Sequence, residues 1–123
     1  MIPKTLINLF IMLNTTDETF DRHVLAARNP VMVYFWAPWC KLCHLVEPTL
    51  LKTQGEFPVP LQIARVNADE NLKLAATYRL KILPTLVLFA QGELIYRLEG
   101  FPGRDELYRS LSQASLQLLT PSL

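Results

Sequence analysis

Hydrophobic residues recur with two different periods along this chain, and the change of period predicts alternating strands and helices. Apolar-rich runs at 31–36, 61–66 and 86–90 are typical of buried strands. Helical spacing of three and four residues appears in four sets: Phe20, Val24, Ala27; Leu45, Val46, Thr49, Leu50; Leu72, Ala75, Ala76; and Leu107, Leu111, Ala114, Leu118. Because a strand, helix and strand in this order form a parallel pair with a right-handed crossover, we predict an α/β domain with one sheet.

Turn residues divide the second half of the chain. Gln91-Gly92 predicts a tight hairpin turn after the strand at 86–90, and the segment 93–99 alternates apolar and polar residues as a strand with one solvent-facing side does. Pro48 falls within the helix expected to end near Glu56, where a proline removes one hydrogen bond. Pro84 stands just before a strand, a place where proline is tolerated.

The N-terminal region carries the apolar run 6–13 behind Lys4. Asn8 interrupts this run and no small-residue cleavage site follows, so we favour a first strand over a signal peptide. Met12 offers an alternative start, with 1–11 as an extension, and we expect 120–123 to be a frayed tail of a single domain spanning 1–123. Next along the chain, Thr15 and Glu18 fit a capping box, and His23 is interpreted as a surface histidine.

Composition narrows the possible functions. Half of the 123 residues are hydrophobic and the formal net charge is +1, with acidic and basic residues scattered. This pattern is unlike a basic nucleic-acid-binding stripe, and no apolar run approaches the ~20 residues of a membrane span. The two cysteines lie in one tight motif, which is typical of a redox site and not of a disulfide-stapled scaffold.

Cys40 and Cys43 have the spacing C-x-x-C and follow a predicted buried strand, at the start of a predicted helix. A helix N-terminus stabilises a thiolate, which is the form that attacks disulfides, so the motif predicts a redox dithiol. A zinc site would need both histidines, His23 and His44, as further ligands. Cys40 to His44 also satisfies the C-x-x-C-H pattern of covalent haem, and two inert buried cysteines are a fourth interpretation.

The segment Trp36-Ala37-Pro38-Trp39-Cys40-x-x-Cys43 resembles the active site of thioredoxins and protein disulfide isomerase domains. The segments 66–69 (Val-Asn-Ala-Asp) and 82–85 (Ile-Leu-Pro-Thr) are also similar to thioredoxins, and the resemblance extends from about Phe20 to about Leu111. It implies the thioredoxin fold, a central mixed sheet of about five strands with helices on both faces.

The resemblance also implies a site and a reaction. Cys40 would attack a substrate protein's disulfide, and Cys43 would then resolve the mixed disulfide. The bond before Pro84 would be cis, with Pro84 facing the dithiol. An apolar docking rim for the substrate would comprise Trp39, Pro38, Leu83, Pro84, Gly100 and Phe101.

Three residues depart from the thioredoxin pattern, and we expect them to tune the redox chemistry. Lys41 and Leu42 stand where thioredoxins have Gly-Pro, and Tyr34 replaces an acidic residue. We expect a more oxidising and slower protein, because the lysine and a freed backbone N–H of Leu42 favour the reduced form while tyrosine is a poor base. The alternative function is a redox-inactive binding module that uses the same fold.

The expected partners follow from this interpretation. They are protein disulfide substrates and a thioredoxin reductase or other dithiol donor, with no cofactor, metal or nucleic acid. We expect a monomer without a membrane span, located in the cytoplasm.

Overall fold

The computed structural model describes residues 12–119. The predicted extension at 1–11 and tail at 120–123 lie outside the described residues. Within the described part, every strand expected after the N-terminal segment is present and the end of each predicted strand lies within one residue of its expected position.

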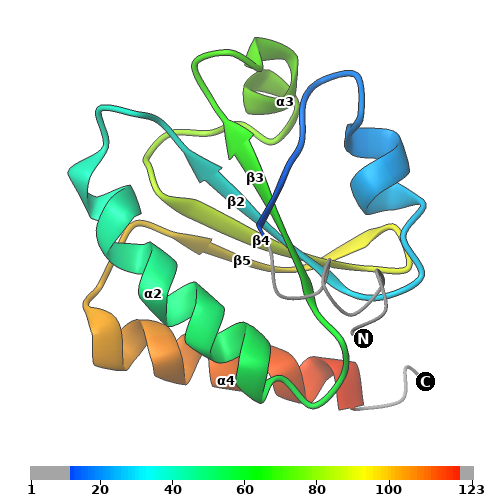
Figure 1. Ribbon diagram of the computed structural model, residues 1–123, viewed down its shortest axis with the longest axis vertical. Helices are drawn as coiled ribbons and strands as arrows, with labels where there is room; N and C mark the ends of the chain where they lie inside the picture. The colour runs from blue at the N-terminus through cyan, green and yellow to red at the C-terminus, as the bar shows by residue number, and fades with distance from the viewer. Residues whose placement is uncertain (1–11, 120–123) are drawn as a thin grey trace, which may run out of the picture.

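A five-stranded sheet forms the centre of the molecule, with strand order β1-β3-β2-β4-β5 (Figure 1). The strands are β1 (Met12–Asn14), β2 (Val31–Trp36), β3 (Gln62–Asn67), β4 (Thr85–Ala90) and β5 (Glu93–Glu99). β3 pairs in parallel with β1 and β2, whereas β4 is antiparallel to both β2 and β5. The sheet is therefore mixed, as predicted, and β2 lies at its centre.

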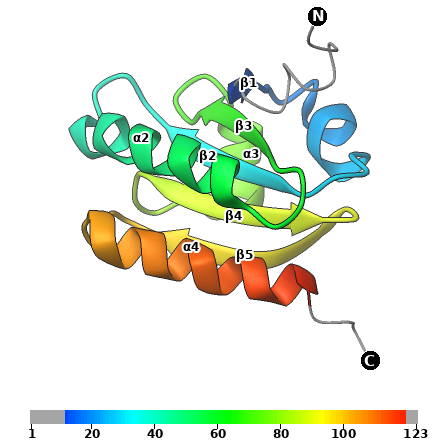
Figure 2. The same ribbon diagram turned by 60° about the horizontal axis from the view of Figure 1, so that its bottom comes forward.

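Helices cover both faces of the sheet. The long helices α2 (Lys41–Glu56) and α4 (Arg104–Leu119) pack side by side on one face (Figure 2). The short helices η1 (Asp21–Leu25) and α3 (Leu72–Thr77) contribute Val24 and Leu74 to the hydrophobic cluster on the other face, together with Phe20 directly before η1. Alternate residues of β2 serve the two clusters, with Tyr34 under α2 and Phe35 on the opposite side.

The alternation expected in β5 is interrupted. The pairing register between β4 and β5 shifts at Leu88 and Phe89, where Tyr96 and Leu94 are the respective partners and Ile95 is the extra residue. Such a bulge breaks the period of two, so Ile95 packs against the same cluster as Tyr96. The predicted strict division of β5 into an apolar face and a wet face was therefore wrong.

The first turn after β1 also differs from the prediction. Instead of capping a helix, the Thr15 hydroxyl contacts Nδ1 of His23 at 3.0 Å, and η1 has no side-chain cap. The predicted capping box with Glu18 was wrong. His23 remains partly exposed, as expected of a surface histidine, and its ring is hydrogen-bonded to Thr15.

Candidate active site

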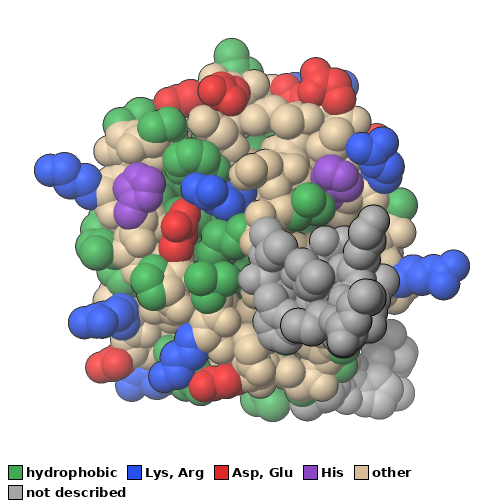
Figure 3. All heavy atoms as spheres, in the orientation of Figure 1, with side chains coloured by type: hydrophobic (Ala, Val, Ile, Leu, Met, Phe, Trp, Pro, Cys, Tyr) green, Lys and Arg blue, Asp and Glu red, His purple; other side chains and the backbone are tan. Residues whose placement is uncertain are grey.

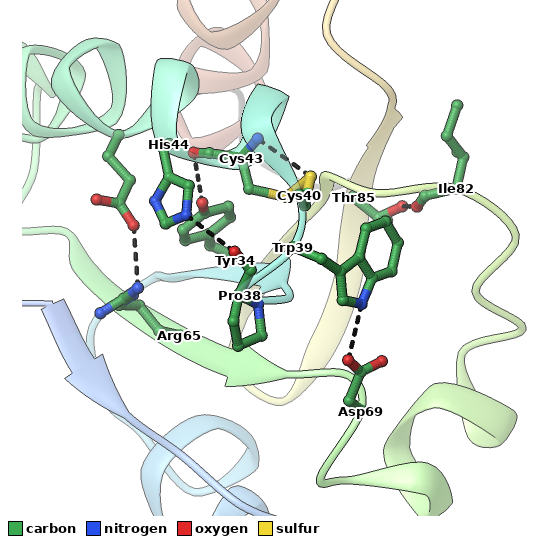
Figure 4. Close-up of a disulfide and its surroundings, with 11 residues drawn as sticks. Tyr34, Pro38, Trp39, Cys40, Cys43, His44, Arg65, Asp69, Ile82 and Thr85 are labelled. Carbon is green, nitrogen blue, oxygen red and sulfur yellow. Dashed lines mark hydrogen bonds and ion pairs between the residues drawn. A yellow bond between two sulfur atoms is a disulfide. The ribbon is translucent and has the colours of Figure 1, made fainter.

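Cys40 and Cys43 form a disulfide at the junction of β2 and α2, with their Cα atoms 5.3 Å apart (Figure 4). Cys40 is the N-cap residue of α2, as the strand-to-helix pattern predicts. Its backbone N–H donates to the carbonyl of Ala37 at 3.0 Å, which closes the turn between the strand and the helix. Both cysteines are buried, and Cys40 retains 5% exposure while Cys43 has none.

The sulfur of Cys40 acts as the cap of α2. It accepts a hydrogen bond from the backbone N–H of Cys43 at 3.1 Å. A donor aimed at sulfur and the positive end of the helix dipole both favour negative charge on that atom, so a thiolate is stabilised at Cys40. We expected the N–H of Leu42 to be this donor, and the structure places that of Cys43 there instead.

Trp39 stands beside the disulfide with 67% of its surface exposed. Its indole Nε1 donates to Oδ2 of Asp69 at 2.8 Å, which fixes the ring against the loop after β3 (Figure 4). The sequence motif at 66–69 is the signal that could have identified this partner, but its role as an anchor for Trp39 was missed. Trp36, at the end of β2, packs against the hydrophobic cluster instead.

The segments around Pro84 and Gly100 meet. The Leu83–Pro84 bond is cis, and the N–H of Gly100 donates to the Pro84 carbonyl at 2.8 Å. Of the six rim residues, Trp39 and Pro38 are exposed, Leu83 and Phe101 are half-buried, and Pro84 and Gly100 are buried. Ile82 was missed from the predicted rim, although 48% of it is exposed and its side chain lies against Gly100.

Tyr34 lies fully buried beneath the first turn of α2. Its hydroxyl donates to the carbonyl oxygen of Cys43 at 2.5 Å. Burial raises the pKa of the Tyr34 phenol well above its ordinary value, and the neighbouring Glu47 carboxylate raises it further, although Arg65 opposes the shift. The phenol is therefore protonated at neutral pH and does not act there as a base.

Glu47 and Arg65 form an ion pair beside Tyr34, with the Arg65 Nη2 and Glu47 Oε1 atoms 3.0 Å apart. The Arg65 guanidinium also stacks on the Trp36 ring, 4.2 Å from its centroid. Sequence reasoning missed both charged residues. The alternation of side chains along β3 indicates that Arg65 shares with Ile63 the face of the sheet under α2. Its partner on α2, Glu47, is identified only once the helix is packed on the sheet.

The residues that zinc would require are not brought together. Among residues 12–119 no group of three or more His, Cys, Asp or Glu side chains converges as a metal site. His23 bonds to Thr15 near the opposite face, while Nε2 of His44 contacts the Pro38 carbonyl at 3.4 Å. In this oxidised state the two sulfurs are bonded to each other and are not free to hold a metal or haem.

The two residues between the cysteines, Lys41 and Leu42, which depart from Gly-Pro, are both exposed. Lys41 is the first residue of α2 and brings a cation beside Cys40.

No helix in the described part of the chain is long and apolar enough to cross a membrane.

Comparison with known proteins agrees with this geometry. The family model for thioredoxin matches residues 11–113. Thioredoxin of Mycobacterium tuberculosis (strain H37Rv) is 36% identical over 100 residues, covering 81% of this chain and 86% of the relative. Thioredoxin 1 of Nostoc sp. is 34% identical over 98 residues, covering 80% and 92% respectively. The bifunctional thioredoxin reductase/thioredoxin of Mycobacterium leprae is 34% identical over 105 residues, which are 85% of this chain and 23% of that protein.

Proposed function

Since this chain belongs to the thioredoxin family and is a thiol-disulfide oxidoreductase acting on protein disulfides through Cys40 and Cys43, we propose that it is a slow, specialised thioredoxin. The observation that carries the proposal is the Cys40 sulfur at the N-cap of α2, where the N–H of Cys43 donates to it. No observation favours the redox-inactive binding module.

Cys40 is the proposed nucleophile. Its thiolate attacks one sulfur of a substrate disulfide, forms a mixed disulfide and releases the other substrate sulfur as a thiolate, which takes up a proton. Cys43 then loses its proton and attacks the Cys40 sulfur. This step closes the disulfide seen in the structure and releases the second substrate thiol. One substrate disulfide is reduced while one protein dithiol is oxidised.

Tyr34 is the proposed cause of slow resolution. The Cys43 thiol is buried, and the phenol beneath it has a raised pKa and already donates its hydrogen to the Cys43 carbonyl. A group in that state does not accept the Cys43 proton at neutral pH. Mixed disulfides with substrates should therefore live longer than they would beside a carboxylate.

Substrates dock, in this proposal, on the rim formed by Trp39, Pro38, Leu83, Pro84, Gly100 and Phe101, to which we add Ile82. The exposed Trp39 ring and Ile82 side chain supply apolar surface close to the disulfide. The Trp39–Asp69 hydrogen bond holds one side of this surface in place. An extended substrate segment would pair with the backbone of Leu83.

The remaining proposals concern the setting in which the protein works. We propose one domain over 1–123, a monomer, recharged by a thioredoxin reductase or another dithiol donor. Support for a reductase comes from the Mycobacterium leprae relative, whose name joins a thioredoxin reductase to a thioredoxin. A cytoplasmic location is supported by cysteine usage, because both cysteines serve one dithiol as is usual in reducing compartments.

Catalysed reduction of insulin by dithiothreitol tests the function. We expect weak but measurable catalysis by the wild-type protein and none by Cys40→Ser. Cys43→Ser should trap mixed disulfides with substrate proteins, which non-reducing electrophoresis detects, while Cys40→Ser should trap few. Wild-type activity equal to that of Cys40→Ser would overturn the proposed function, and trapping by Cys40→Ser alone would reverse the assignment of the nucleophile.

A further inference from the structure

A basic groove lies along the junction of α2 and α4. This groove has a volume of about 810 Å³. Its lining includes Pro48 and Lys52 from α2, and Arg104, Asp105, Tyr108 and Arg109 from α4. In Figure 3 basic side chains gather over these two helices, with acidic side chains between them.

The residues that line the groove carry an excess of positive charge. Three of its charged residues are basic, Lys52, Arg104 and Arg109, against the single carboxylate of Asp105. In the described part of the chain the ion pairs are Glu47–Arg65 and Arg97–Glu99, and neither includes a groove residue. Because the whole chain has a formal charge of only +1, this is a local concentration of cations.

The wall of the groove is held in place by contacts between the two helices. The Tyr108 hydroxyl donates to Oε2 of Glu56 at 2.5 Å and so joins α4 to α2. The Lys52 ammonium lies over the Tyr108 ring, 5.2 Å from its centroid. These contacts fix one cation and one aromatic face at the centre of the groove, while both arginines are left exposed to bind a partner.

An exposed stripe of α2 leads from the active site to the groove. Lys41, Leu45, Pro48 and Lys52 follow one another at helical spacing and are all exposed. Lys41 adjoins Cys40, and Lys52 lies about 16–17 Å further along the axis at 1.5 Å per residue. About five residues of an extended chain, at 3.3–3.6 Å each, span that length. A substrate bound at Cys40 therefore reaches the groove with a short flanking segment.

We propose that the α2–α4 groove binds an acidic segment of the substrate protein, located about three to six residues from the cysteine under attack. The inference rests on the proposed function and adds a specificity determinant to it. Arg104 and Arg109 supply guanidinium groups suited to carboxylates, and Lys52 adds a third cation. Asp105 repels an acidic segment, but its single carboxylate is outnumbered by the three cations of the groove.

Three disulfide peptides of equal length test the proposal. Each carries the same disulfide and a tail that begins four residues from a cysteine. The tail consists of glutamates, serines or lysines, and each set of three is made once with the tail beyond the first cysteine and once with it beyond the second. With wild-type protein at low salt, we expect kcat/KM to rank glutamate above serine above lysine, with the difference confined to KM. The glutamate tail should gain roughly threefold to tenfold, the scale of a few exposed charge pairs, and the gain should fall as salt rises.

Reversing the charge of the groove arginines shows whether the groove causes the preference for the glutamate peptide. In Arg104→Glu/Arg109→Glu the glutamate preference should disappear, whereas Lys73→Glu, an exposed reversal on α3, should keep it. The serine peptide and circular dichroism report whether each variant still folds and exchanges disulfides. Equal kcat/KM for all three peptides with wild-type protein would overturn the proposal, and so would a preference that survives the double reversal.

Two further measurements keep the outcomes separate. Reduction of no peptide at all would contradict the proposed function, and the groove is then tested by fluorescence anisotropy with a cysteine-free glutamate peptide. Binding lost in the double reversal but kept in Lys73→Glu supports the groove, and absence of binding overturns it. Inorganic phosphate that abolishes the preference at matched ionic strength would indicate a small-anion site and contradict an acidic protein segment as the occupant.

Discussion

The Tyr34 hydroxyl donates a hydrogen bond to the Cys43 carbonyl at 2.5 Å and so ties β2 to the first turn of α2. Both residues are fully buried. Tyr34, one of the three residues that depart from the thioredoxin pattern, is thus a structural link to the backbone of Cys43, the proposed resolving cysteine. We therefore expect both stability and the rate of resolution to depend on this one phenol.

Tyr34→Phe should lower the free energy of unfolding. The substitution keeps the ring but removes the donor to a buried carbonyl, a change that costs about 1–3 kcal/mol. Urea unfolding of the oxidised protein measures the loss. Tyr108→Phe serves as the matched control, because it removes an exposed hydrogen bond and should change stability by less than about 0.5 kcal/mol.

Tyr34→Asp should speed the resolution of mixed disulfides while destabilising the fold. It places a carboxylate, a better proton acceptor than a protonated phenol, beside Cys43, but at a buried position where charge is disfavoured. Insulin turnover and thermal unfolding are measured together. A variant that folds normally yet turns over at the wild-type rate would show that the missing carboxylate does not limit this site.

The reduction potential should lie above the about −270 mV of thioredoxin. Lys41 brings a cation beside Cys40, and the Cys43 N–H bonds to its sulfur, so the reduced thiolate form is stabilised. Titration against glutathione gives the value, with about 30 mV for each 1.4 kcal/mol. Lys41→Gly/Leu42→Pro should lower the potential, and Lys41→Gln alone isolates the part due to charge. A wild-type potential at or below that of thioredoxin would contradict this account.

Asp17→Ala should destabilise the protein by about 1 kcal/mol, as loss of a helix cap does. Oδ1 of Asp17 accepts the N–H of Leu74 at 3.0 Å, and the Asp17 N–H donates to Asn71 at 2.8 Å. Asp17 therefore caps α3 from a distant part of the sequence. Glu18→Ala is the control, because Glu18 is exposed and the capping box assigned to it does not form. Equal losses for the two variants in urea unfolding would refute this role.

His23 should make stability fall in mild acid. Burial, and then the nearby Arg22 charge, lower the pKa of His23 below its ordinary 6.5. The unfolded state then binds the proton more readily than the folded state, so stability drops as pH falls through 6.5 and levels off below the lowered folded pKa. Thermal unfolding between pH 5 and pH 7.5 should show a smaller drop for His23→Gln. An unchanged pH dependence in that variant would refute the assignment.

Local patterns were sufficient for the individual strands after the N-terminal segment and for the cysteine turn, whereas the mixed sheet of about five strands was expected from the resemblance to thioredoxins. Val31–Trp36 and Lys41–Glu56 lie where the pattern predicts them. Contacts between distant segments were not predictable in the same way. The bonds of Asp17 to Leu74 and of Trp39 to Asp69 join residues whose proximity depends on the assembled sheet.

The same distinction explains the errors. Thr15 and Glu18 have the spacing of a capping box, but tertiary packing placed the Thr15 hydroxyl against His23. The period of β5 was disrupted by a bulge at Ile95, which a single sequence does not reveal. Glu47 was missed because its partner Arg65 comes from the following strand.

The central position of β2 has a consequence for synthesis. β2 leads directly into the cysteine turn, but its other neighbour, β4, pairs with it through distant residues such as Val87, opposite Val33. The ribosome adds about 5–20 residues per second, so the roughly 40 residues between Cys43 and β4 take a few seconds. During that interval the nascent chain presents both thiols without the sheet that buries them. Before β4 has emerged, the newly made dithiol is therefore open to reaction with other thiols and disulfides.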